Sequence, residues 1–138
     1  MSIEELIKST AERFEGSFIF DDWQTADLEL ERKELPVIIA VLPTTGKITF
    51  DSVGQAHKEK FLALSFLDKV PRDATGEENA EVYTRMEDKA LQFVASLNAS
   101  GAIEPIESVE YTHVYEAMSD VVSGVMLSLV IKSKGICV

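Results

Sequence analysis

Few side chains in this sequence stand in patterns that could perform chemistry. The two histidines, His57 and His113, have no cysteine or second histidine at ligand spacing, whereas a metal site needs three or four converging ligands. We therefore expect both to be structural. Cys137 is the single cysteine, so an internal disulfide is excluded, and we expect an inert thiol there.

The segment Thr44-Thr45-Gly46-Lys47 resembles part of a phosphate-binding loop only superficially. A P-loop needs a glycine five residues before Gly46 and a hydroxyl residue after the lysine, and this sequence has Val41 and Ile48 there. A turn at residues 43–46 is the better interpretation.

Carboxylates give no sharper candidate. Asp21 and Asp22 lack the alternating oxygen ligands and the glycine of a calcium loop, and no G-x-S-x-G nucleophile motif occurs. An enzyme that uses scattered carboxylates such as Asp21, Asp22 and Glu116 remains a minor alternative, because no base–nucleophile pair can be named. We predict no catalytic, cofactor-binding or metal residues.

Composition limits the class of protein and its partners. The 138 residues fit one domain spanning 1–138, and 46% are hydrophobic, which suits a globular core. No apolar run reaches the roughly 18 residues of a membrane span, so we expect a cytoplasmic protein that does not bind membranes. The net charge of −11 is concentrated in residues 1–34. This acidity disfavours sequence-specific binding to nucleic acid.

The elements that must position any site begin with a helix and continue as strands. Ser2 and Glu5 predict a helix start, and Gly16 its end. Alternation of apolar and acidic residues predicts a strand at residues 26–31, and continuous apolar runs predict buried strands at 37–42 and 60–67. Residues 43–46 would join the 37–42 strand to a short strand at 47–50, and residues 54–57 would form the next connection.

The second half predicts one long helix and two closing strands. Thr75 or the residues after it would cap a helix over 77–98, whose apolar residues recur every three or four positions. Residues 108–115 and 124–133 alternate as strands. The sequence thus predicts an α+β domain in the order helix, four strands, long helix, two strands. Its helices would pack on a mixed or antiparallel sheet.

This element order resembles the tail-terminator and tail-completion proteins of long-tailed bacteriophages and prophages. The resemblance covers nearly the whole chain and rests on that order, on Leu35-Pro36 opening the central strand, and on the small-residue segment 120–125 before the last strand. It implies a homo-oligomeric ring, commonly a hexamer. Such a ring caps the tail tube, contacts tail-tube and neck proteins, and lets DNA pass through its opening.

On that resemblance, the acidic residues Asp27, Glu29 and Glu31 are candidates for a lumen or surface that repels DNA; a solvated surface is the alternative. The protein would assemble in the bacterial cytoplasm and reside in the virion tail. No catalytic residue or cofactor is implied. A small protein- or ligand-binding module, monomeric or dimeric, is the competing hypothesis for the whole chain.

Overall fold

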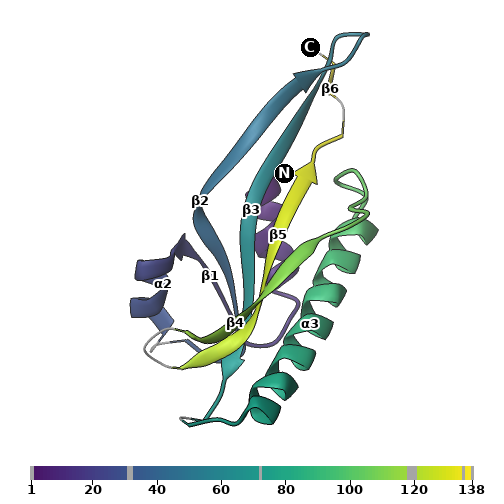
Figure 1. The fold of residues 1–138 in the computed structure, drawn as a ribbon. Coiled ribbons are helices and arrows are strands. Elements are labelled where there is room, and N and C mark those ends of the chain that lie inside the picture. The colour runs from purple at the N-terminus through teal and green to yellow at the C-terminus, as the bar shows by residue number, and fades with distance from the viewer. Residues whose placement is uncertain (1, 31–32, 72, 118–120, 135, 138) are drawn as a thin grey trace.

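The computed structural model describes residues 2–30, 33–71, 73–117, 121–134 and 136–137. It has the predicted α+β class, with helices packed on a mixed sheet whose strand order is β1-β2-β3-β5-β4 (Figure 1). Strands β1 and β2 are parallel, the other pairs are antiparallel, and β6 pairs with β3. The elements are α1 (Ile3–Ala11), β1 (Ser17–Asp22), α2 (Trp23–Leu30), β2 (Val37–Phe50), β3 (Gln55–Lys69), α3 (Gly76–Ala99), β4 (Glu110–Ala117), β5 (Val122–Lys132) and β6 (Ile136–Cys137).

The two faces of the sheet are covered by different helices. Helices α1 and α3 pack on one face over the larger core, which contains the fully buried Phe66 and Phe93. Their rings meet edge to face with centroids 5.4 Å apart, and Phe14 packs on Phe93 at 5.7 Å. The smaller helix α2 covers part of the opposite face with Ala26 and Leu30. Burial on both sides explains the continuous apolar runs of β2 and β3.

Helix α3 follows the prediction closely. Thr75 and Glu78 form a reciprocal capping box at its start, and Phe93 and Leu97 lie on its buried stripe. Helix α1 also begins as predicted, since the Ser2 hydroxyl accepts the Glu5 N–H. It ends at Ala11, however, several residues before the predicted end at Gly16.

The predicted strand at residues 26–31 is wrong: α2 occupies this position. The Asp22 carboxylate accepts the Thr25 N–H at 2.7 Å and caps the helix start. Ala26 and Leu30, four residues apart, then fall on one buried face, whereas Leu28 is 72% exposed. The apolar alternation suggested a strand, but only two of its three apolar residues are buried.

The predicted turn at residues 43–46 is also wrong. Strand β2 runs through it to Phe50, with a register irregularity between Val41 and Thr45. The chain reverses instead at residues 51–54, where the Asp51 carboxylate accepts the N–H groups of Val53 and Gln55. The predicted connection at 54–57 is therefore mostly strand, because β3 already begins at Gln55.

Candidate interaction surfaces

Residues 44–60 form a two-stranded projection, called the arm below. None of these residues is buried, whereas β2 and β3 are buried where they cross the body. Figure 1 shows the arm extending beyond the helices at the top of the molecule, with the C-terminal end of the chain beside it. Strand β6 pairs with Gln55 and Ala56, and the Ser133 N–H donates to the Lys58 carbonyl at 2.8 Å. These contacts brace the arm along β3.

Large apolar side chains are exposed on the arm. Ile48 is 61% exposed, Phe50 66% and Val53, in the turn, 79%. Ile48 lies opposite Lys58 and Phe50 opposite Ala56, so the register places these four side chains on one face of the arm. Single exposed apolar residues are normal on protein surfaces, but a cluster on one projecting element marks an interaction site.

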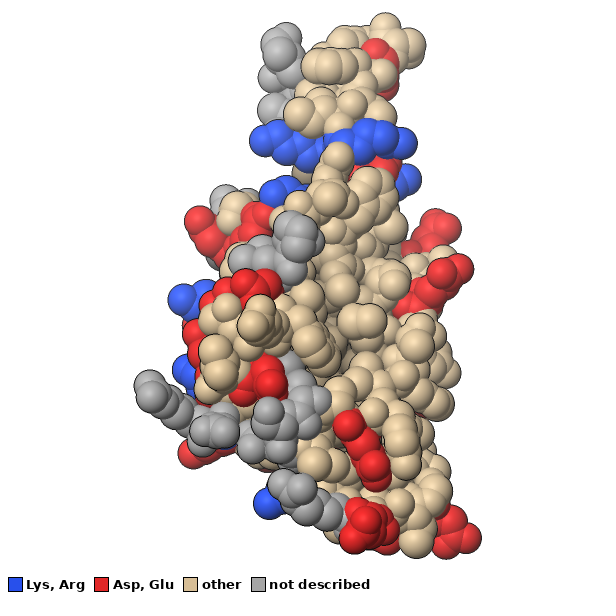
Figure 2. All heavy atoms as spheres, turned by 60° about the vertical axis from the view of Figure 1, so that its left-hand side comes forward, with Lys and Arg blue, Asp and Glu red and all other residues tan. Residues whose placement is uncertain are grey.

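The arm also carries the opposite charge balance from the rest of the protein. It holds Lys47, Lys58 and Lys60 against Asp51 and Glu59, a net charge of +1 in a chain of −11. In Figure 2, lysine and arginine side chains form a band across the arm, while acidic side chains gather over the body below. The arm is therefore a basic and apolar extension of an acidic body.

An ion pair ties the base of the arm to α1. The Lys60 ammonium donates a hydrogen bond to the Glu4 carboxylate, and both side chains are about one-third exposed. This hydrogen bond is the main cause that lowers the pKa of Glu4 below the ordinary 4.5. A carboxylate with a lowered pKa stabilises the fold above the unfolded-state pKa, and the stabilisation is lost as the pH falls through the folded-state value.

We expect Glu4→Gln to lower the free energy of unfolding at pH 7 by less than about 1 kcal/mol, because the pair is solvent-screened. At pH 3 the difference from the wild type should shrink, since Glu4 is then largely protonated in the unfolded chain and increasingly so in the folded one. Urea unfolding at both pH values measures it. Glu5→Gln, which removes a neighbouring charge that does not contact Lys60, is the matched control. A Glu4→Gln difference that is equal at both pH values would contradict this assignment.

Both histidines have partners that agree with the structural role expected of them. His57 Nε2 lies 3.2 Å from the Asp51 carboxylate in the arm. His113 Nε2 lies 2.6 Å from the Glu87 carboxylate, and its ring stacks on Tyr83 with centroids 4.2 Å apart. Within the described ranges, no three His, Cys, Asp or Glu side chains gather as a metal site would require.

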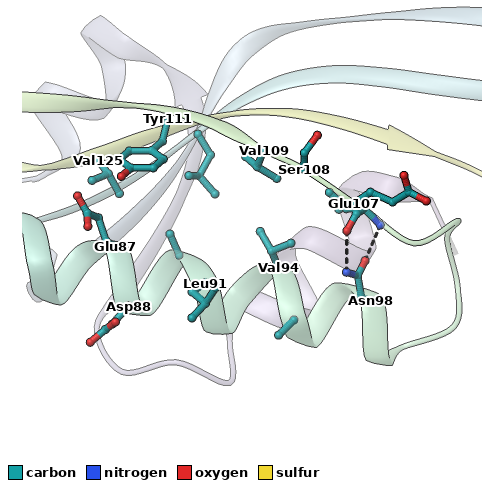
Figure 3. A pocket seen from close by; sticks show the side chains of 14 residues that line it. Glu87, Asp88, Leu91, Val94, Asn98, Glu107, Ser108, Val109, Tyr111 and Val125 are labelled. Carbon is teal, nitrogen blue, oxygen red and sulfur yellow. Dashed lines mark hydrogen bonds between the residues drawn. The ribbon is translucent and has the colours of Figure 1, made fainter.

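A groove of about 560 Å³ lies between α3 and the chain that leads into β4 (Figure 3). Helix α3 packs mainly on β5 and β3, so the space beside β4 is left open. Val94, Val109 and Tyr111 line it, with Val125 of β5 below. At one end Asn98 makes two hydrogen bonds to the backbone of Ile106, of 2.8 and 3.0 Å, which fix that wall to the helix.

The groove has an apolar lining and an acidic rim. Leu91, 70% exposed, lies on its α3 side. The charged residues that line it are Glu87, Asp88 and Glu107, with no lysine or arginine among them. Glu87 is engaged by His113, so Asp88 and Glu107 are the exposed rim charges. The groove can accept an apolar element that carries positive charge.

The acidic candidates from the sequence do not form a row. Asp27 and Glu29 lie on α2, and residues two apart on a helix point about 200° apart rather than to one side. Glu31 lies outside the described residues. The carboxylates of the enzyme alternative are also dispersed. Asp21 and Asp22 end β1 at one edge of the sheet, and Glu116 lies in β4 at the other edge. Four strand spacings separate the two edges, a distance of roughly 20 Å.

Sequence reasoning missed both the arm and the groove. A usable signal for the arm was present, because Ile48, Phe50 and Val53 are interspersed with the polar residues Lys47, Thr49 and Asp51 between two continuous apolar runs. The groove had no local signal, since it depends on how far α3 sits from β4. Finding it requires the tertiary structure.

The chain matches no protein-family profile, and no curated protein sequence matches it significantly. No helix within the described part of the chain is long and apolar enough to cross a membrane.

Proposed function

We propose that this protein is a non-enzymatic structural protein that assembles with copies of itself, in the manner of phage tail terminators. The observation that carries the proposal is the arm: a braced β-hairpin that projects from the body and exposes Ile48, Phe50 and Val53. The exposed apolar side chains of the arm do not stabilise the core of their own chain. Burying them against another chain would give a favourable free energy of association.

The stiffness of the arm favours binding. Fully burying an apolar side chain contributes about 1.5–3 kcal/mol, and these three side chains are already mostly exposed in the free protein. Ordering flexible segments normally offsets part of such a gain. The β3 part of the arm pairs with β6 and its Lys58 carbonyl accepts the Ser133 N–H, so the arm loses little freedom on docking and more of the gain remains.

Several features suit a ring on a phage tail. An element on one subunit that binds a different surface of the next gives head-to-tail contacts, which close into a ring when the rotation permits. The partners would then be further copies of the chain, six in the commonest such rings, with tail-tube and neck proteins above and below. Asp27 and Glu29 on α2 would keep DNA from adhering if that helix faces the opening. Assembly would take place in the bacterial cytoplasm and the product would reside in the virion tail.

A second candidate function follows from the groove. Its volume of about 560 Å³ falls in the range of ligand pockets, so a small binding module that holds a peptide or ligand between α3 and β4 is the alternative. In that case the protein would act as a monomer or dimer, and its arm variants would bind the same ligand as the wild type.

Light scattering and negative-stain electron microscopy over a range of concentrations test the assembly. We expect the wild type to form discrete oligomers, and Ile48→Ser/Phe50→Ser/Val53→Ser to stay monomeric with unchanged circular dichroism. Leu28→Ser, which alters an equally exposed apolar residue on α2, is the control and should assemble normally. A wild type that is monomeric throughout contradicts the proposal. Tail-tube and tape-measure genes beside this gene would support its tail assignment.

A further inference from the structure

We infer that the arm of one copy docks into the groove between α3 and β4 of the next copy. This inference rests on the proposed assembly and names the two surfaces that make it. The groove residues that carry it are Leu91, Val94 and Tyr111, and the arm residues are Ile48, Phe50 and Val53.

The two surfaces match in form. The arm presents a narrow ridge, because its exposed apolar residues follow one face of a hairpin and its turn. The groove is elongated along α3, from Glu87 to Asn98, and has room for several side chains in its 560 Å³. Leu91 and Tyr111 are exposed and Val94 and Val109 partly so, whereas Val125 beneath them is buried; Figure 3 shows Val94, Val109 and Tyr111 around the groove. A ridge of apolar side chains would cover them.

The two surfaces also match in charge. Lys58 lies opposite Ile48 on the apolar face of the arm, and its ammonium makes no ion pair with any described residue. Asp88 and Glu107 lie exposed at the rim of the groove, and no basic residue lines it. Opposite charges that face each other across a contact favour the correct partner and its orientation. By the same rule, the groove repels an acidic peptide or an anionic lipid.

An arm cannot fill the groove of its own chain. Strands β2 and β3 carry the arm beyond the ends of the helices (Figure 1), and none of the residues that line the groove belongs to the arm. The pairing of β3 with β5 and β6 fixes that direction. The contact must therefore join two copies through different surfaces, which is the heterologous geometry of rings and filaments.

Site-directed cross-linking tests the contact even when association is weak. In a Cys137→Ser background, Phe50→Cys and Leu91→Cys proteins are mixed and treated with a short bismaleimide. We expect a cross-linked dimer that forms at least ten times faster than in a mixture of Phe50→Cys with Leu28→Cys. Leu28 is the matched control, since it is an exposed leucine on another helix, at 72% against 70%. Equal rates in the two mixtures overturn the inference.

A charge-reversal cycle supplies the second test. Lys58→Glu and Asp88→Lys/Glu107→Lys should each weaken self-association at least tenfold by light scattering, and the combined variant should recover most of the loss. Full assembly of both reversed variants overturns the docking contact while the assembly itself stands. A wild type that neither oligomerises nor cross-links overturns both. If the arm variant fails to assemble while the groove variant assembles normally, the arm binds a different surface of the neighbouring copy, and the groove assignment is overturned.

Discussion

We expect Gly124→Ala to destabilise the fold by more than about 3 kcal/mol, a large part of the stability of a domain of this size. Gly124 lies in β5 beside Leu67 of β3, and a Cβ added to it would meet the Phe66 carbonyl oxygen at 1.9 Å. No rotamer relieves this clash, because both atoms belong to backbone positions held by the sheet. The two central strands would have to separate, with loss of packing on both faces.

Urea unfolding followed by circular dichroism measures this effect. Gly76→Ala is the matched control, since a Cβ at Gly76 meets no atom within 4 Å and the residue lies at the start of α3. We expect that variant to unfold within about 0.5 kcal/mol of the wild type. If Gly124→Ala also stays within that range, the close approach of β5 to β3 at this point is incorrect.

The second large effect should come from Phe93→Ala, with a loss of about 3–5 kcal/mol. Phe93 is fully buried at the centre of the larger core and contacts Phe14 and Phe66. Its removal leaves a cavity where the segment after α1, helix α3 and strand β3 meet, and these elements can collapse into it only partly. Phe93→Leu should lose less, because it retains most of the volume.

The neighbouring position on α3 gives a direct comparison. Leu91 is 70% exposed, so Leu91→Ala should change the free energy of unfolding by less than about 0.5 kcal/mol. Under the docking inference the same variant should weaken self-association. Two residues only two positions apart on α3 would thus have separate roles: Phe93 would stabilise the fold, and Leu91 would contribute to self-association. A Leu91→Ala protein as unstable as Phe93→Ala would show that the helix is rotated from the position described.

The sequence was most informative where several local signals agreed. Helix α3 has a capping box at Thr75 and an apolar stripe through Phe93 and Leu97, and its predicted span of 77–98 is confirmed within one residue at each end. The interior strand at 60–67 is likewise confirmed as part of β3. In α3 the buried positions repeat every three or four residues over several turns, which favours a helix. In β3 the apolar run is continuous, and its short length favours a strand buried on both faces.

Prediction failed where a short pattern fitted two structures. Ala26 and Leu30 fit both a strand of period two and a helix with contacts four residues apart, and the cap from Asp22 decides for the helix. The Pro43–Gly46 segment has turn composition, yet β2 continues because β3 pairs with it on both sides of the irregularity, at Val41 and from Thr45 onward. Tertiary pairing overrides local preference here, and the arm and groove follow from such long-range placement.

Because the strands that brace the arm come late in the sequence, the arm is completed late during synthesis. Strand β3 leaves the ribosome early, but its later neighbours β5 and β6 are made only after α3 and β4. Until then the arm is an isolated hairpin, which is at best marginally stable in water. Under the docking inference, a nascent chain would therefore lack a finished arm, and copies would join only after each body has folded.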